Sequence, residues 1–218
     1  MSGATEGHAL VLLPADRHRS YRWQNGLGTA TEIAVEAVGL RTDGGLGDGV
    51  GDAPAAPGWT LSIATVESDV AFSSFPGVDR QLMALSAGGL GLVIDGQPVE
   101  LDRWRVAAFD GASAVSSRGV VGPTLDLNLM VSRDRFRGSL EVGVVDGSRL
   151  VTTPPGATTF VVFLDGLLSA EGPGLDPRAL QRHDTLRLEA GTLSLTGDAT
   201  IVLARILPRR LMGASAVR

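Results

Sequence analysis

The sequence predicts an all-β fold, and three observations lead to that prediction. Short runs rich in Val, Ile, Leu and Thr recur along the 218 residues, and many of them alternate apolar with polar side chains. Turn-forming residues, among them 29 glycines and 11 prolines, punctuate the chain. No stretch keeps apolar residues at the spacing of an amphipathic helix. This pattern is typical of a sandwich or barrel with few or no helices.

The expected strands follow one another from the N-terminus. In chain order they are Ala9–Leu13, Thr31–Ala37, Trp59–Val66, Gln81–Leu85, Leu90–Ile94, Trp104–Phe109, Thr124–Val131, Leu140–Val145, Thr158–Leu164, Thr185–Leu188 and Thr200–Leu207. The best helical candidate is Asp176–Gln181, which follows Pro173 and allows one or two turns at most. Residues 39–58 are rich in glycine and predict a mobile loop, but they lack the Lys-Ser/Thr pair of a phosphate-binding loop.

Two stretches of the chain share one order of strands and turns. Leu85–Ser117 and Phe163–Gly197 each contain an apolar strand, a Gly-Leu step, a turn with an acidic residue, and a later strand that ends at a glycine. Such internal similarity indicates a duplicated unit. We therefore expect a first barrel over residues 1–135, with an N-terminal arm and loop 39–58, and a second barrel over residues 136–218. The two barrels are expected to pack as one compact protein.

Composition excludes several classes of function. The net charge is −5, from 19 basic residues that are all arginine and 24 acidic residues, so the chain repels nucleic acid. Cysteine is absent, which excludes disulfides, thiolate chemistry and Cys-based zinc sites. No apolar run reaches the roughly 18 residues of a membrane span, and the N-terminus lacks the pattern of a signal peptide. The expected location is cytoplasmic, without a membrane or nucleic-acid partner.

Three polar clusters interrupt the apolar pattern, over residues 21–32, 59–85 and 126–130. The third reads Asp-Leu-Asn-Leu-Met, and strict alternation assigns Asp126 and Asn128 to one strand face and the two leucines to the other. If the polar face points into a barrel, these side chains need partners, because an unpaired buried polar group costs about 1–3 kcal/mol.

These clusters together resemble the HutD/Ves family of cupin-type proteins. The resemblance rests on WQNGLGTATEI, WTLSIATVESDVAFSSFPGVDRQLMAL and DLNLM, and it follows the whole chain in order. It implies a double cupin-type β-barrel, a jelly-roll-like bicupin, and an association with histidine utilisation or stress responses, without a settled catalytic activity. The sequence departs from the family at Leu27, where glycine is common, and in the length of tract 39–58.

Carried over by position, the resemblance implies one ligand pocket in the first barrel. Its expected residues are Trp23, Asn25, Thr29, Glu32, Ser62, Ser73, Phe75, Asp79, Arg80, Asp126 and Asn128. The residue types suit a small carboxylate, because Arg80 offers paired planar donors while Trp23 and Phe75 offer apolar walls. The alternative is that Arg80 pairs with Asp79, Glu32 or Asp126 in an internal structural network.

No metal, cofactor or catalytic nucleophile is expected. The three histidines, His8, His18 and His183, form no His-x-His pair and lie outside the three clusters. No Gly-x-Ser-x-Gly elbow is present.

Three functions remain open at this point. The leading hypothesis is a metal-free protein, not an enzyme, that binds a small anionic metabolite and modulates histidine utilisation. The second is a metal-independent isomerase or hydrolase that uses Glu32 or Asp126 as its base. The third is an interaction module without a ligand, and a homodimer is compatible with all three.

Overall fold

The computed structural model describes residues 10–23, 26–36 and 58–209. These residues form strands and one short 3-10 helix, η1 (Ala15–Arg17), and no α-helix occurs among them. The strands are β1 (Leu10–Leu13), β2 (Arg19–Arg22), β3 (Gly28–Glu36), β4 (Trp59–Val66), β5 (Val78–Ala84), β6 (Leu90–Ile94), β7 (Gln97–Leu101), β8 (Val106–Asp110), β9 (Val115–Arg118), β10 (Thr124–Ser132), β11 (Phe136–Thr153), β12 (Thr158–Gly172), β13 (Leu175–Ala179), β14 (Thr185–Leu188) and β15 (Gly191–Pro208). The predicted all-β class is confirmed.

Each run predicted from the sequence contains or overlaps a strand, and β4, β6 and β14 agree with the prediction to the residue. The prediction of a helix at Asp176–Gln181 was wrong, because most of that segment belongs to β13, which pairs with β12. Residues 176–179 of β13 are exposed, and Pro177 is tolerated there because β13 pairs with one neighbour only. The sequence also missed β2, β7 and β9, which lie at sheet edges.

The described chain divides into two compact units. Residues 10–17 and 141–209 form one, which we call the C-terminal unit, and the described residues between 18 and 140 form the other, the N-terminal unit. This division lies within β11, a few residues after the expected boundary at 135/136. It also assigns β1 to the C-terminal unit, because β1 pairs with β14 from Leu10↔Leu188 to Leu13↔Thr185. The predicted loop 39–58 lies outside the described residues except for Gly58.

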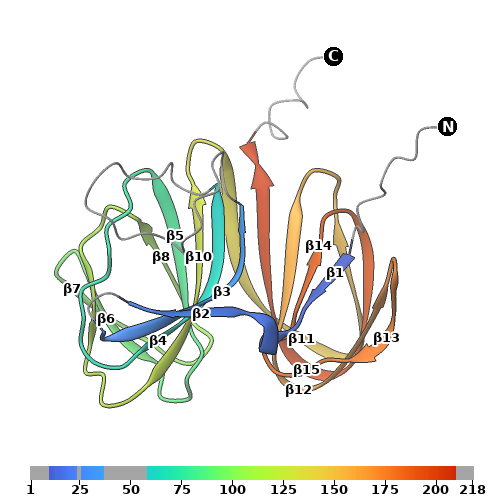
Figure 1. Cartoon of the computed structure of the whole chain (residues 1–218), viewed down its shortest axis with the longest axis horizontal. Helices are drawn as coiled ribbons and strands as arrows, with labels where there is room; N and C mark the ends of the chain where they lie inside the picture. The colour runs from blue at the N-terminus through green and yellow to red at the C-terminus, as the bar shows by residue number, and fades with distance from the viewer. Residues whose placement is uncertain (1–9, 24–25, 37–57, 210–218) are drawn as a thin grey trace. The chain divides into compact units, whose positions relative to one another are not determined.

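The N-terminal unit contains two antiparallel sheets, one with the order β2-β3-β4-β10-β5-β8 and one with the order β7-β6-β9. Figure 1 shows β5, β8 and β10 side by side in this unit. Leu82 and Ala84 of β5 pack with Leu90 and Leu92 of β6 in a hydrophobic cluster. The face of the six-stranded sheet that holds Leu82 therefore points toward the small sheet, and we call it the inner face.

The opposite face of the six-stranded sheet is buried as well. Leu61, Leu127 and Leu129 lie on it and are almost inaccessible to solvent. Gln81 of β5 shares that face, where its Nε2 donates to the carbonyl of Gly138 at 2.9 Å and its Oε1 accepts from the amide of Leu140 at 2.7 Å. Along β4 and β10 the residues of this face are mostly apolar, while the inner face includes the polar residues Thr60, Ser62, Asp126 and Asn128.

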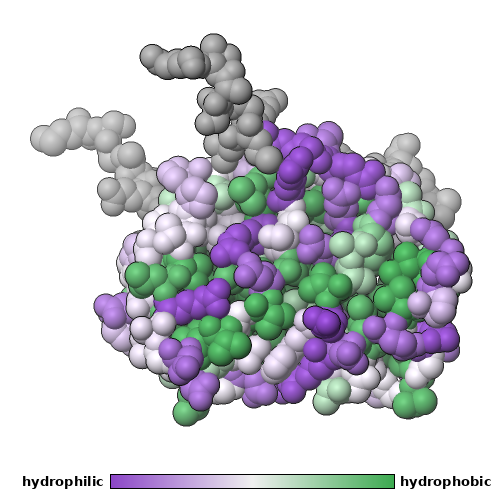
Figure 2. Space-filling model, turned by 180° about the vertical axis from the view of Figure 1, so that it is seen from behind, coloured by the Kyte–Doolittle hydropathy of each residue, from purple (hydrophilic) through white to green (hydrophobic). Residues whose placement is uncertain are grey.

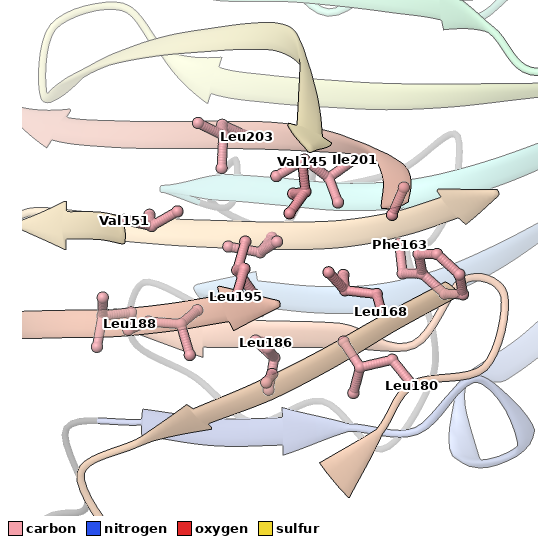
Figure 3. Packing of buried hydrophobic residues seen from close by; sticks show 14 of the residues in the cluster. Val145, Val151, Phe163, Leu168, Leu180, Leu186, Leu188, Leu195, Ile201 and Leu203 are labelled. Carbon is pink, nitrogen blue, oxygen red and sulfur yellow. The ribbon is translucent and has the colours of Figure 1, made fainter. Parts of the chain in front are cut away.

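The C-terminal unit is built on one sheet with the order β1-β14-β12-β15-β11, to which β13 adds at β12. Its two long strands, β12 and β15, pair from Thr158↔Ile206 to Glu171↔Ser194, with a bulge between Phe163 and Asp165. Val151, Leu168 and Leu195, labelled in Figure 3, belong to one hydrophobic cluster and come from β11, β12 and β15. The interior of this unit is therefore filled by its own apolar side chains.

The two units repeat one backbone turn. In the N-terminal unit the amide of Trp104 donates to the carbonyl of Ala84 at 2.7 Å, and in the C-terminal unit the amide of His183 donates to the carbonyl of Phe163 at 2.7 Å. Trp104 and His183 both adopt left-handed backbone conformations, with φ of 67° and 69°. The neighbouring hydrogen bonds repeat at the same spacing, Ala84 to Arg105 matching Phe163 to Asp184. The internal similarity seen in the sequence thus has a counterpart in the hydrogen bonding.

Among the described residues, each sheet has distinct first and last strands, so no sheet closes into a barrel by its own ladder. No helix in the described part of the chain is long and apolar enough to cross a bilayer. Apolar and polar residues are interspersed over the face shown in Figure 2.

Candidate functional site

A group of buried polar side chains lies on the inner face of the N-terminal unit. Arg80 of β5, Asn128 of β10 and Ser62 of β4 are 7%, 7% and 8% exposed, and Asp126 of β10 is fully buried. Strand register brings them together, because Met130 pairs with Arg80 on β5 while Asn128 pairs with Ser62 on β4. Paired residues share a sheet face, and alternation along β10 keeps Asp126 and Asn128 on it.

Hydrogen bonds join three of these side chains in a chain. Arg80 donates from Nη2 to Asn128 Oδ1 at 3.2 Å, and Asn128 donates from Nδ2 to Asp126 Oδ1. Arg80 also donates from Nη1 to the carbonyl of Ser73 at 3.3 Å. Both ends of the Asn128 amide are thus used, which fixes its orientation. Asn128 stands between the guanidinium and the carboxyl group as a neutral spacer.

Aromatic rings surround the Arg80 guanidinium. Its Cζ lies 5.8 Å from the ring centre of Phe72, 5.7 Å from that of Phe75 and 5.1 Å from that of Phe109. The Trp23 ring meets Phe72 edge to face with centroids 6.3 Å apart. A cation over ring faces is stabilised by about 0.5–2 kcal/mol per contact. The rings therefore hold the guanidinium in place while they exclude water from it.

Three buried polar atoms on the inner face have no hydrogen-bond partner among the described residues: Arg80 Nε, Asp126 Oδ2 and Thr60 Oγ1. Thr60 pairs with Met130, the residue that pairs on its other side with Arg80. Such atoms cost about 1–3 kcal/mol each when unpaired, and native proteins rarely leave several together. Because these unpaired atoms lie on one face, we take the inner face as the candidate functional site.

Burial sets the electrostatics of this group. Desolvation raises the pKa of Asp126 to about 7, while the Arg80 charge and the Asn128 hydrogen bond oppose that shift. Desolvation also lowers the pKa of Arg80, and the Asp126 charge partly offsets the effect. A guanidinium remains protonated at neutral pH in spite of such a shift. The site therefore combines a permanent cation with a carboxyl group that changes charge near neutrality.

Several residues expected in the pocket lie around Arg80. Phe75 contacts the guanidinium by its ring, and Trp23 reaches it through Phe72. Ser73 contributes its backbone carbonyl, which accepts from Arg80 Nη1. Glu32 of β3 pairs with Ser62 and so shares the inner face.

Other expected residues point elsewhere. Asp79 pairs with Val131 on the opposite face of the sheet and forms an ion pair of 2.6 Å with Arg133. Thr29 pairs with Thr65, which also belongs to the opposite face. The internal network expected as the alternative for Arg80 thus excludes Asp79 and includes Asp126 through Asn128. Asn25 lies outside the described residues.

Sequence reasoning missed Phe72, Phe109 and Thr60. Phe109 reaches Arg80 because β8 pairs with β5 in the register Arg80↔Phe109. Phe72 belongs to the second polar cluster, three residues before Phe75, and this proximity is the signal that could have added it to the expected site. Thr60 lies two residues before Ser62 on β4, and residues two apart on a strand share a face.

Within the described ranges, no group of three or more His, Asp or Glu side chains is arranged to hold a metal ion. His183 lies in the turn before β14, in the C-terminal unit. His18 lies between η1 and β2.

The fold and the site define an all-β protein of two units with a buried cationic site in its N-terminal unit. The chain belongs to the HutD family, which it matches over residues 15–204. An uncharacterised 21.2 kDa protein from the hutC 3′ region of Pseudomonas putida is 34% identical over 184 residues, covering 83% of this chain and 87% of that protein. The HutD/Ves resemblance seen in the sequence is confirmed.

Two further relatives agree with this assignment. Protein Ves of Citrobacter koseri is 29% identical over 142 residues, covering 64% of this chain and 66% of that protein. The structure of HutD from Pseudomonas fluorescens SBW25, described as a formate condition, superposes with a TM-score of 0.73 at 28% identity. That comparison covers 92% of this chain and 99% of the other.

Proposed function

We propose that the N-terminal unit binds a small carboxylate at Arg80, and that the protein thereby senses or sequesters a metabolite of histidine utilisation. The observation that supports this most strongly is the free Nε of Arg80. Among the described residues, Nη1 and Nη2 each have a neutral acceptor, while Nε has none. The edge formed by Nε and Nη2 matches the two oxygens of a carboxylate.

The charge of Arg80 favours an anion as the occupant. Among the described residues Arg80 makes no direct ion pair, because Asn128 separates it from Asp126. Burying a guanidinium without a contacting anion is costly, and an incoming carboxylate recovers part of that cost. Arg80, Asn128 and Ser62 are only 7–8% exposed and Arg80 Nε is buried, so the proposed occupant has to be small.

Two features of the relatives support the proposal. The Pseudomonas fluorescens HutD structure is described as a formate condition, and formate is the smallest carboxylate. The Pseudomonas putida relative comes from the hutC 3′ region, which agrees with the link to histidine utilisation that the family implies.

Thermal shift with four carboxylates tests the proposal: glutamate, formylglutamate, formiminoglutamate and urocanate. Three proteins are compared, the wild type, Arg80→Lys and the control Arg133→Lys, which alters a surface ion pair instead of the site. We expect at least one compound to raise the Tm of the wild type and of Arg133→Lys, and to leave Arg80→Lys unchanged. A ligand at a hundredfold excess over Kd adds about 2.7 kcal/mol to stability. If no compound raises any Tm at millimolar concentration, or all three proteins respond equally, the proposal is wrong.

A second candidate function is proton transfer by Asp126. A carboxyl group with a pKa of about 7 is suited to act as a general acid or base at neutral pH, which favours the isomerase or hydrolase hypothesis. Turnover of the same four compounds by purified protein, followed by loss of turnover in Asp126→Asn, would support it. Binding without turnover at high protein concentration would leave the sensor as the function.

We also propose that the two units are two cupin-type barrels of a bicupin, as the sequence resemblance implies. The support is the repeated turn at Trp104 and His183, with its matching hydrogen bonds to Ala84 and Phe163. The units differ in their buried charged residues: the N-terminal unit buries Arg80 and Asp126, which keep atoms unpaired among the described residues, while Asp184 of the C-terminal unit accepts from two backbone amides. We therefore assign ligand binding to the N-terminal unit.

A further inference from the structure

The proposed carboxylate site contains a second carboxyl group close by. Asp126 is fully buried, its Oδ1 accepts from Asn128, and its Oδ2 has no partner among the described residues. When the site is empty, the negative Asp126 and the positive Arg80 offset one another through Asn128. When a carboxylate contacts Arg80, two negative groups share a single positive one inside the protein.

Such an arrangement is unfavourable unless one carboxyl group takes up a proton. Two carboxylates that share a buried site do not both remain ionised, because their repulsion is weakly screened there. The ligand carboxylate contacts Arg80 directly and so keeps its charge. Asp126 is separated from Arg80 by Asn128, so Asp126 is the group that takes up the proton.

We infer that the site binds its carboxylate together with one proton, which is held on Oδ2 of Asp126. This inference rests on the proposed function above. The proton comes from solvent, one O–H bond forms, and no other bond changes. Once protonated, Oδ2 becomes a hydrogen-bond donor, and the neutral Asp126 still accepts from Asn128 through Oδ1.

The direction of the Asp126 pKa supports this linkage. Burial already raises that pKa to about 7, and the Arg80 charge is the main effect that holds it down. An anion on Arg80 cancels that effect, so the pKa rises further in the complex. Linkage then requires that binding be tightest where Asp126 is protonated, and that it weaken as pH rises above about 7.

The other titratable side chains that the structure describes on the inner face belong to the strands beyond β4. They are Glu32 of β3, and Arg19 and Tyr21 of β2, which pair with Glu32 and Ala30. Glu32 thus has a cation as its cross-strand neighbour, and β4 and β6 contain no titratable residue. The acidic groups of the other neighbouring strands are held in surface ion pairs: Asp79 and Asp110 with Arg133, and Glu100 with Arg118.

Sodium formate is the suitable probe, because it carries no hydrogen-bond donor that could satisfy an ionised Asp126. Its Kd is measured by thermal shift and by Trp fluorescence between pH 6 and pH 8.5, against sodium chloride at the same ionic strength. The wild type is expected to bind about tenfold or more weakly at pH 8.5 than at pH 6, with little change below pH 7. Asp126→Asn is expected to show the same Kd at both pH values.

Proton uptake by the wild type provides a second measurement in case Asp126→Asn fails to fold. Titrating formate calorimetrically at pH 7.5, in buffers of different ionisation enthalpy, reports the number of protons bound. A value between one half and one supports the inference. Binding with no proton uptake and one Kd at all pH values overturns the inference and leaves the proposed function standing. Absence of formate binding at every pH, together with absence of any response to the four larger carboxylates, overturns both.

Discussion

Arg80 on β5 and Asn128 on β10 are diagonal neighbours on one sheet face, and a hydrogen bond of 3.2 Å joins Nη2 of the first to Oδ1 of the second. This contact orients the Asn128 amide, so that its Nδ2 meets Asp126. It also engages one side of the guanidinium and leaves Nε without a partner. The candidate ligand site is a consequence of that geometry.

Asp126→Asn is expected to change how stability depends on pH. The folded pKa of about 7 lies above the ordinary value of 3.8, so the folded wild type binds more protons than the unfolded chain between these values. Its stability therefore falls as pH rises toward 7 and levels off above it. Relative to the wild type, the variant should gain about 1.4 kcal/mol per pH unit between pH 5 and pH 6.5. Urea unfolding at several pH values measures this difference, and a constant difference would contradict the burial of an ionisable Asp126.

Gln81→Glu should weaken the N-terminal unit. The new carboxylate still accepts from the Leu140 amide, but its other oxygen faces the carbonyl of Gly138, where Gln81 now donates. We expect a loss of about 1–3 kcal/mol at pH 7 that diminishes toward pH 4.5, because protonation restores a donor. Gln97→Glu makes the same change of charge at an exposed position and is the control. Equal urea midpoints for the two variants at pH 7 would show that the Gln81 contacts contribute little.

Gly28→Ala should disturb the aromatic contact next to Arg80. A Cβ at position 28 would lie 2.6 Å from Trp23 Cε3 and 2.7 Å from the backbone oxygen of Thr65. The overlap is expected to cost about 1–3 kcal/mol, because the backbone oxygen cannot move freely. Gly122→Ala is the matched control, since no atom lies within 4 Å of its added Cβ. Thermal unfolding of both variants tests this, and similar Tm values for the two would refute the close packing of Trp23 on Gly28.

Much of the fold could be predicted because buried strands have a strong sequence signal. β4, β6 and β14 are short runs rich in Leu, Ile, Val and Thr between turn residues, and the predicted limits agree with the structure. The missed strands β2, β7, β9 and β13 lie at edges, where one side faces solvent and polar residues or Pro177 replace the apolar pattern. The internal similarity indicated a repeat, but the turn shared by Trp104 and His183 is seen only in the backbone hydrogen bonds and φ angles.

The candidate site was predicted in part. Alternation along β10 assigned Asp126 and Asn128 to one face, and the same rule separates Asp79 from Arg80 along β5, although the sequence prediction grouped them. The contact between Arg80 and Phe109 depends on the β5–β8 register, and the contact with Asn128 depends on the β5–β10 register. Both registers join distant segments of the chain, and no local pattern specifies them.

The most direct measurement of the central claim observes the Arg80 Nε–H itself by NMR. Its ¹H–¹⁵N signal is assigned as the one lost in Arg80→Lys, and sodium formate is then titrated at pH 6 against sodium chloride. We predict that this signal shifts progressively and saturates with formate, while the Arg133 signal, assigned in the same way, stays constant. An Arg80 signal that formate leaves unmoved, or that moves equally with chloride, would contradict a carboxylate site at Arg80.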